Sequence, residues 1–342
     1  MTKDKIIFFA SGDFAIDTFE LMVKNGSNIV GLVTCEDRVK FHKKTIKEVA
    51  QELRIPYYKV KGNNLEDDVF LIDWLKRLNA DIFCVISFKK LPKNIIKMAK
   101  KCAFNVHASL LPFLRGAAPI NWAIRLGYKE TGLTAFVLSD KIDTGDIIAN
   151  TKVKIAAGTN YTTLYKKLSN RCVDFTDFVI NDVLQRENWK RYLFIQPPCN
   201  EDSISLNDYI IKAPKIDSSY FRCHWSKFMA DRIKNLVDSV NDIGLNCVII
   251  TDDDGKPLKF EAKIFDVEVV DNEEYTTEYC QSDGKTYIKL NSFDGKKGVL
   301  IKEIQLAGKK RMNVADFLNG FRYFRDKEGA TIITDLMEAE QV

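Results

Sequence analysis

The sequence lacks the motifs by which many enzymes hold nucleotides or metal ions. Neither Gly-x-x-x-x-Gly-Lys-Ser/Thr nor Gly-x-Gly-x-x-Gly occurs in its 342 residues, which argues against a phosphate-cradling loop for ATP or a dinucleotide. Its three histidines, His42, His107 and His224, lie far apart, and its eight cysteines form no Cys-x-x-Cys pair. We therefore expect no metal site, and free thiols in a reducing compartment.

Long apolar runs are also missing. The first apolar run, Ile6 to Ala10, is too short for the core of a signal peptide, and no run approaches the roughly 20 residues of a membrane helix. Hydrophobic residues make up 46% of the chain and charged residues 29%, which is ordinary for a soluble globular protein. These absences predict a cytoplasmic protein that does not engage a membrane, and we expect it to act as a monomer.

Positive charge is unevenly distributed along the chain. Residues 1–205 hold 31 Lys+Arg against 23 Asp+Glu, whereas residues 206–342 hold 20 against 24. The densest basic block, residues 88–101, contains no acid and has lysines at Lys89, Lys90, Lys93, Lys97, Lys100 and Lys101. Such a block is often only a solvated helix face. The alternative is a patch that faces the phosphates of RNA.

The hydrophobic periodicity predicts alternating strands and helices in the first half of the chain. The expected strands are Lys5–Ala10, Ile29–Thr34, Ile82–Ile86 and Ala103–His107, with a further apolar run at Leu133–Leu138. Helical spacing covers Ala15–Asn25, Ile46–Leu53, Asp67–Leu78, Pro92–Lys101, Pro119–Leu126 and Tyr161–Leu184. This alternation is typical of an α/β fold with a doubly wound, mostly parallel sheet.

The pattern changes near residue 191, where the periodicity fades and Gln196-Pro197-Pro198 interrupts the chain. Short strands are expected beyond it, at Cys247–Thr251, Lys263–Val270, Thr286–Leu290 and Gly298–Gln305. A small β-barrel fits this pattern. We therefore expect a first domain at 1–190, a linker at 191–209 and a second domain at 210–342.

Three polar residues in the first domain form a candidate catalytic cluster. Asn105 and His107 end an expected strand and, being two residues apart, face the same side. Asp143 lies in a glycine-containing turn after the next apolar run. A carboxylate can orient an imidazole for proton transfer, and an amide can donate to an oxygen that gains negative charge. Such a set suits acyl transfer to an amine. Taken singly, the same residues are more often a hydrogen-bonded pair and an ordinary turn.

The string around this cluster resembles the methionyl-tRNA formyltransferase family. The resemblance is carried, in the family's order and spacing, by Asn105-x-His107-x-Ser109-Leu110-Leu111-Pro112, Arg115-Gly116-Ala117-Ala118-Pro119, Thr131-Gly132-x-Thr134 and Asp143-Thr144-Gly145-Asp146. Shorter matches occur at Gly12-Asp13-Phe14-Ala15, Ala213-Pro214-Lys215-Ile216 and Gly308-Lys309-Lys310-Arg311-Met312. The resemblance thus spans most of the chain, in patches after the linker.

The resemblance implies a Rossmann-like formyltransferase domain followed by an OB-like domain that helps to hold tRNA. It implies that Asn105, His107 and Asp143 are catalytic. The formyl donor would be 10-formyltetrahydrofolate, bound by the segment Ser109, Leu110, Leu111 and Pro112, and the acceptor would be the α-amine of initiator methionyl-tRNA. Candidate contacts to the acceptor are Phe14, Arg38, Lys43, Lys44, Lys89 and Lys90.

The sequence departs from the family pattern in two places. The stretch Glu36–Thr45 is shorter than the family's loop and lacks its Pro and Gly residues, although it keeps a basic character. The C-terminal part lacks the family's Pro-Trp-Pro or Pro-Tyr-Pro element. Two alternatives therefore stay open. One is a formyltransferase acting on a nucleotide-linked amino sugar, and the other is a non-catalytic RNA- or folate-binding protein built on the same fold.

Overall fold

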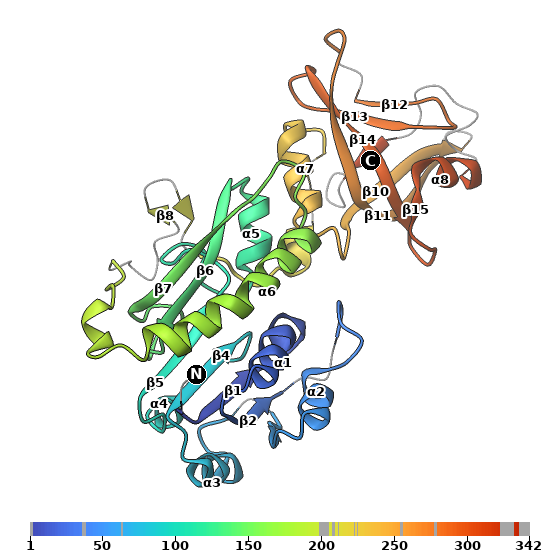
Figure 1. Cartoon of the computed structure of the whole chain (residues 1–342). Coiled ribbons are helices and arrows are strands. Elements are labelled where there is room, and N and C mark those ends of the chain that lie inside the picture. The colour runs from blue at the N-terminus through green and yellow to red at the C-terminus, as the bar shows by residue number, and fades with distance from the viewer. Residues whose placement is uncertain are drawn as a thin grey trace. The chain divides into compact units, whose positions relative to one another are not determined.

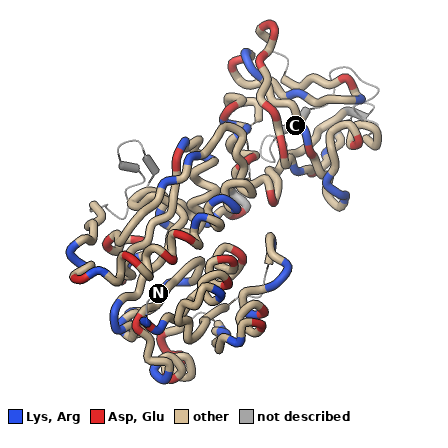
Figure 2. Tube along the Cα trace, viewed as in Figure 1, with Lys and Arg blue, Asp and Glu red and all other residues tan. Residues whose placement is uncertain are grey.

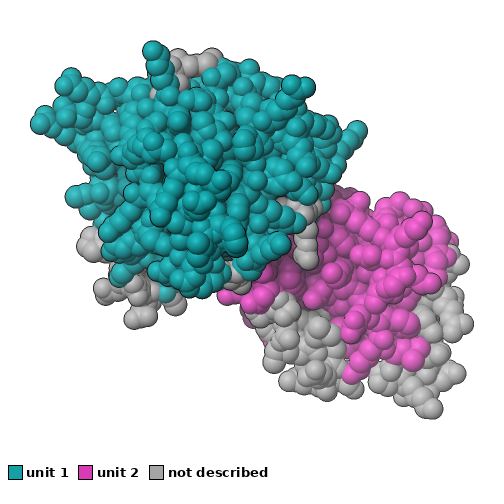
Figure 3. Space-filling view, turned by 90° about the horizontal axis from the view of Figure 1, so that it is seen from below, with its two compact units in different colours: residues 1–119, 130–155, 165–214 teal, residues 120–129, 156–164, 215–342 magenta. Residues whose placement is uncertain are grey.

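The chain forms two compact units that are not continuous in sequence. The computed structural model describes residues 3–35, 39–62, 64–197, 205–206, 209–210, 212–221, 223, 225–253, 256–276, 279–321 and 332–334. Unit 1 comprises residues 1–119, 130–155 and 165–214, and unit 2 comprises residues 120–129, 156–164 and 215–342 (Figure 3). Two segments from the first half of the chain thus belong to the C-terminal unit.

Unit 1 is built on one mixed sheet in the order β3-β2-β1-β4-β5-β6-β7 (Figure 1). Its strands are β1 (Ile6–Ala10), β2 (Ile29–Thr34), β3 (Tyr57–Lys59), β4 (Ile82–Ile86), β5 (Cys102–His107), β6 (Glu130–Val137) and β7 (Ile147–Lys154). The first five strands in this order, β3, β2, β1, β4 and β5, pair in parallel. Strand β6 runs antiparallel to β5, and β7 runs antiparallel to β6. The predicted mostly parallel sheet is confirmed.

Helices of unit 1 pack on both faces of this sheet. In chain order, the helices up to residue 178 are α1 (Ile16–Lys24), α2 (Ile46–Glu52), α3 (Val69–Leu78), α4 (Lys93–Ile96), α5 (Pro119–Arg125), which belongs mainly to unit 2, and α6 (Tyr161–Phe178). Phe8 of β1 packs on Phe19 of α1, with ring centroids 5.6 Å apart. Its neighbour Phe9 points to the other face, into an apolar cluster with Leu71 and Leu75 of α3. The alternation of buried residues along β1 therefore produces the predicted doubly wound arrangement.

The structure corrects the predicted helix Pro92–Lys101, because α4 ends at Ile96. The following residues already belong to the sheet edge: Lys100 N donates to Ala80 O at 3.4 Å and Lys101 N to Asp81 O at 2.8 Å. These bonds align the start of β5 with β4, so the helix stops to let the strand begin. Strands β3 and β7 were not predicted, since their exposed lysines and short apolar runs weaken the strand signal.

Unit 2 contains an antiparallel sheet in the order β12-β13-β14-β11-β10-β16, with β15 paired to β14. The strands are β10 (Leu245–Asp253), β11 (Lys256–Asp271), β12 (Cys280–Ser282), β13 (Ile288–Asn291), β14 (Lys297–Leu306), β15 (Met312–Asn313) and β16 (Ile332–Thr334). The hydroxyl of Tyr279, just before β12, donates to the carbonyl of Ile333 in β16 at 2.6 Å. This bond joins the two ends of the strand order, as expected for a partly closed, OB-like barrel.

The core of unit 2 lies between this sheet and two helices, α7 (Ala230–Asp238) and α8 (Val314–Gly320). Ile233 and Leu236 of α7 and Phe317 of α8 are buried with the inward side chains of β10, β11 and β14. Trp225, just before α7, is fully buried in the same cluster. Within the described part of the chain, no helix combines the length and apolar character needed to cross a membrane.

The carboxyl of Asp238 predicts a pH dependence of stability. Only 4% of Asp238 is exposed. Burial raises its pKa from 3.8 to about 6, against the opposing effect of the Lys234 ammonium 2.7 Å away. Between these two pH values the folded state holds a proton that the unfolded state has lost, so this carboxyl lowers stability as pH rises through the interval. Asp238→Asn removes that loss.

We therefore expect the difference in unfolding free energy, Asp238→Asn minus wild type, to increase between pH 4 and pH 7 in urea titrations. Asp231→Asn is the matched control, because its side chain is 71% exposed on the same helix. Its difference should change little with pH. Parallel curves for Asp238→Asn and the control would contradict this account.

Candidate active site

The predicted catalytic residues lie where parallel strands of unit 1 end. Ser11, after β1, donates its N–H to the carbonyl of Ser87, after β4, at 3.1 Å. Asn105 and His107 end the adjacent strand β5, where Asn105 pairs with Val85 of β4 and His107 with Thr134 of β6. The strand order reverses between β1 and β4. Ligands of open α/β sheets bind at such a point.

The imidazole of His107 is held between a carbonyl and a carboxylate. Its side chain is 7% exposed, and Nε2 lies 2.8 Å from the carbonyl oxygen of Leu114. A carbonyl oxygen only accepts, so Nε2 must carry the hydrogen. Nδ1 then faces Oδ2 of Asp143 at 3.7 Å. Nδ1 is therefore the nitrogen that can exchange a proton with Asp143, through a small movement or one water.

Asp143 is positioned by a turn with unusual backbone geometry. Its φ is +54°, in the left-handed region. Its Oδ2 accepts the N–H of Gly116 at 2.8 Å. Gly145, two residues later, packs so tightly that a Cβ there would lie 1.7 Å from the carbonyl oxygen of Val137. The Asp-Thr-Gly-Asp sequence thus forms a turn, and this turn also carries the carboxylate to His107.

Gln196 secures this turn, and sequence reasoning missed it. Its amide donates to the carbonyl oxygens of Asp143 at 3.1 Å and Gly145 at 2.7 Å. Its own carbonyl oxygen accepts from the guanidinium of Arg115 at 2.5 Å. Gln196 lies in the segment interpreted as a linker, where one glutamine before two prolines carries no recognisable signal. The contact depends on chain segments that only the fold brings together.

The amide of Asn105 is available to a ligand. Its residue is half-buried at the end of β5. Within the described residues its side chain has no hydrogen-bond partner, in contrast to His107 and Asp143. An amide in this position can donate to a substrate carbonyl oxygen without first breaking a bond inside the protein.

The predicted folate segment is folded onto β6 by one threonine. The Thr134 hydroxyl donates to the carbonyl of Ser109 at 2.7 Å and accepts the N–H of Leu111 at 3.1 Å. The Ser109 hydroxyl is used inside the loop, where it donates to the carbonyl of Phe113 at 2.6 Å. Ser109 and Leu111 are buried, whereas Leu110 and Pro112 are partly exposed. Leu110 and Pro112 are therefore the members of this segment that can contact a ligand with their side chains.

The residues predicted to contact the acceptor are dispersed. Phe14 is buried and packs edge-on against Tyr165, with centroids 5.3 Å apart, which makes it part of the core. Lys43 is exposed, and Lys44 forms an ion pair with Glu52 at 2.7 Å. Arg38 lies outside the described residues. The stretch after β2 is anchored to the first turn, because Asp13 accepts the N–H groups of Lys40 and Phe41 at 2.6 and 2.5 Å.

The basic block at residues 88–101 is partly neutralised. Lys89 donates to the carbonyl of Gly62 at 2.7 Å, and Lys90 is exposed. Three other lysines of the block form ion pairs: Lys93 with Asp140, Lys100 with Asp81 and Lys101 with Asp4. Figure 2 shows acidic residues interspersed with basic ones along the chain. Much of the block's charge is therefore balanced locally.

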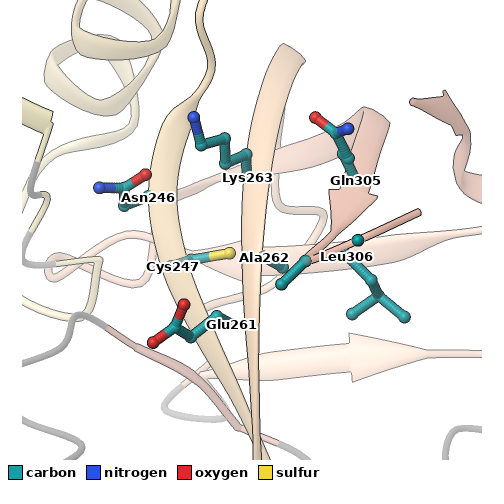
Figure 4. Close-up of a pocket in the computed structure, with 9 residues that line it drawn as sticks. Asn246, Cys247, Glu261, Ala262, Lys263, Gln305 and Leu306 are labelled. Atoms are coloured by element: carbon teal, nitrogen blue, oxygen red, sulfur yellow. The ribbon is translucent and has the colours of Figure 1, made fainter. Parts of the chain in front are cut away.

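Unit 2 has a depression of its own on the OB-like sheet. Figure 4 shows Asn246 of β10, Lys263 of β11 and Gln305 of β14 around it, and the cross-strand register places these three residues in one row. This row of two amides and one ammonium can form hydrogen bonds with a ligand and attract an anion. None of the predicted catalytic residues lines the depression. No group of His, Cys, Asp and Glu side chains suited to a metal ion occurs in the described residues of either unit.

Comparison with known families matches both parts of the chain. Residues 4–174 match the family described as formyl transferase, and residues 215–322 match the family described as formyl transferase, C-terminal domain. The first match contains Asn105, His107, Asp143 and the segment Ser109–Pro112, and the second covers most of unit 2.

Curated relatives are similar in sequence to this chain over nearly their whole length. A methionyl-tRNA formyltransferase of Azobacteroides pseudotrichonymphae is 35% identical over 336 residues, which cover 94% of this chain and 97% of the relative. A methionyl-tRNA formyltransferase of Flavobacterium johnsoniae is 33% identical over 328 residues, covering 94% and 98%. The likeness therefore includes both units.

Solved structures show the same fold at lower identity. The N-formyltransferase of Helicobacter canadensis, in complex with folinic acid and dTDP-3-aminofucose, superposes with a TM-score of 0.61 at 17% identity, covering 88% of this chain and 99% of that one. A sugar 3N-formyl transferase crystallised with dTDP and 5-N-formyl-THF gives a TM-score of 0.60 at 16% identity, covering 91% and 100%.

Two threonines of β6 provide a test of how the loop after β5 is held. Thr134→Val leaves the Ser109 carbonyl and the Leu111 N–H without their partner in a buried place, which should lower the unfolding free energy by roughly 2–3 kcal/mol. Thr131→Val is the matched control, because the Thr131 hydroxyl is buried on the same strand without a hydrogen-bond partner among the described residues. It should be neutral or stabilising in denaturant titrations. Equal effects of the two substitutions would refute the proposed role of Thr134.

Proposed function

This chain belongs to the formyl transferase family, and from this membership we propose that it formylates the α-amine of methionyl initiator tRNA in translation initiation. The observation that carries the proposal is the 35% identity to a methionyl-tRNA formyltransferase over 94% of the chain, together with the meeting of His107 and Asp143 in one site. Its place of action would be the cytoplasm, where tRNA is used.

The formyl donor is a folate, which we specify as 10-formyltetrahydrofolate. The family match and the fold shared with formyltransferases support a folate-type donor. We place it against the partly exposed side chains of Leu110 and Pro112. Ser109 and Leu111 contribute by anchoring the loop to the core. Ser109 is fully buried, and Leu111 packs with Phe136 and Ile147.

The reaction is direct attack of the amine nitrogen on the formyl carbon. A new C–N bond forms, and the carbonyl oxygen gains negative charge in a tetrahedral intermediate. The unoccupied amide of Asn105 donates to that oxygen, a contact worth about 3–4 kcal/mol in comparable sites. The bond from the carbon to N10 of the folate then breaks, giving formylated amine and tetrahydrofolate.

Proton transfer is assigned to the His107–Asp143 pair. The attacking amine loses one proton, and N10 of the folate gains one, so the pair ends the cycle unchanged. The Nε2 bond to Leu114 fixes the ring, and the Nδ1 edge facing Asp143 is the one that exchanges protons. Because Asp143 is held by Gly116 and Gln196, it can take part without large movement.

Binding of the RNA is assigned to exposed cations of unit 1 and to unit 2. Lys43 and Lys90 are exposed, whereas Lys44 and Lys89 would have to exchange their present partners for phosphates. We also assign Arg38 to this group, from the sequence. The polar row Asn246, Lys263 and Gln305 of unit 2 offers a second contact surface.

Single substitutions in the site test the assignment. Asn105→Ala should lower kcat/KM for formyl transfer to charged initiator tRNA by about 10²–10³-fold, and His107→Ala and Asp143→Asn should lower it at least as much. Binding of tRNA should stay near the wild-type value in all three. Asn25→Ala, at an exposed position after α1, is the control. Full formyl-transfer activity of His107→Ala would refute the role of His107. Absence of transfer by the wild type, with tRNA binding intact, would point instead to a non-catalytic binding protein.

The acceptor is tested by offering elongator methionyl-tRNA and nucleotide-linked amino sugars in parallel. Transfer to initiator tRNA alone supports the proposal. Transfer only to an amino-sugar nucleotide would establish the alternative acceptor, which the shortened stretch after β2 favours.

A further inference from the structure

Unit 2 contains a buried arginine whose charge no carboxylate of the described residues neutralises. Arg125 ends α5 and is only 7% exposed. Its Nη1 is buried and has no hydrogen-bond partner among the described residues. Buried guanidinium groups normally have such partners, so Arg125 requires an explanation.

Two aromatic rings surround this guanidinium. Trp122, three residues earlier on the same helix, has its ring centroid 5.8 Å from the guanidinium carbon, and Tyr220 has its centroid 5.7 Å away. The two rings contact each other edge to face at 5.2 Å. Cation–π contact explains how the cation tolerates burial, but ring faces do not accept its N–H groups as an oxygen would.

A second arginine is adjacent. Arg232 of α7 donates from Nη1 to the backbone carbonyl of Arg125 at 2.8 Å, and its guanidinium lies 6.0 Å from the ring of Phe228. Figure 1 shows α5 and α7 close together. Burial, and then repulsion from Arg232, lowers the pKa of Arg125 to about 10. The other groups that act on Arg125 are Cys223 and Tyr220, so no carboxylate among the described residues offsets the charge of Arg125.

Arg125 stays charged at neutral pH, because even the lowered value is well above 7. Arg125 therefore lies beside a second cation, with an unused buried donor and no carboxylate of the described residues to balance it. Such an arrangement is unfavourable unless an anion completes it. Planar guanidinium groups bind phosphate oxygens in pairs, more specifically than lysine does. Arg232 is only half-buried, so an anion can reach the two arginines from its side.

We propose that Arg125 and Arg232 form a binding site for a phosphate group, and that this group is a backbone phosphate of the tRNA acceptor. The phosphate site itself stands on the two arginines alone. Its assignment to tRNA rests on the proposed function, and the two parts are tested separately.

The phosphate site is tested by thermal unfolding with inorganic phosphate at constant ionic strength. Saturating phosphate should raise the unfolding midpoint of the wild type by roughly 5 °C relative to chloride. Arg125→Met should abolish this rise while folding as well as, or better than, wild type without phosphate, since it removes an unpaired buried charge. Arg186→Met, which removes an exposed arginine of unit 1, should retain the rise.

The outcomes separate a ligand site from a structural clamp. If phosphate shifts Arg125→Met as much as wild type, or shifts neither, the site is refuted. If Arg125→Met does not fold, Arg232→Gln decides: loss of the rise supports the site, and an unchanged rise overturns it.

The tRNA assignment is tested by the salt dependence of tRNA binding. One lost phosphate contact should reduce the slope of log K against log salt by about 0.7–0.9 in Arg125→Met and Arg232→Gln, but not in Arg186→Met. An unchanged slope, with the phosphate-induced rise lost, would show that the site takes free phosphate and overturn the tRNA source. Absence of formyl transfer by the wild type would refute the proposed function without affecting the phosphate titration.

Discussion

The position of the Asp143 turn is the constraint on which the site depends. Two segments that are distant in sequence hold it. The N–H of Gly116 binds the carboxylate, and the amide of Gln196 binds the carbonyls of Asp143 and Gly145 while it also accepts from Arg115, the neighbour of Gly116. Gly145 permits the close packing that this requires. If any of these contacts were lost, Asp143 would no longer be fixed beside His107, and the imidazole would keep only its bond to Leu114. In the proposed mechanism, reactivity thus depends also on residues that only position Asp143.

The parts of the fold with strong local signals were predictable. The continuous apolar runs of β2 and β4 were assigned with the bounds that the structure shows, and the two-residue spacing correctly placed Asn105 and His107 at the end of one strand. Alternation of strands and helices sufficed for the mostly parallel sheet, because parallel pairing requires a crossover each time. The approach of Asp143 to His107 was expected, and Nδ1 of His107 lies 3.7 Å from Oδ2 of Asp143 in the structure.

What could not be predicted depends on contacts between distant segments. Nothing near Gln196 in the sequence indicates that it binds a turn fifty residues earlier. The same holds for Thr134. Its hydroxyl meets the carbonyl of Ser109, whereas the hydroxyl of Thr131 has no hydrogen-bond partner among the described residues. The predicted helix beyond Ile96 failed for a related reason, since its propensity was outweighed by pairing of the following residues with β4. The assignment of α5 to the C-terminal unit has no local signal at all.

That assignment of α5 has a consequence for biosynthesis. Arg125 leaves the ribosome about a hundred residues before Arg232, which donates to its carbonyl from α7. At typical elongation rates this interval lasts roughly 5–20 s, longer than most small domains take to fold. The strands of unit 1 can therefore pair in the nascent chain before α7, the helix that α5 contacts, has been synthesised. A fragment that begins at residue 215 would have the reverse defect, since the helix that completes it would be missing.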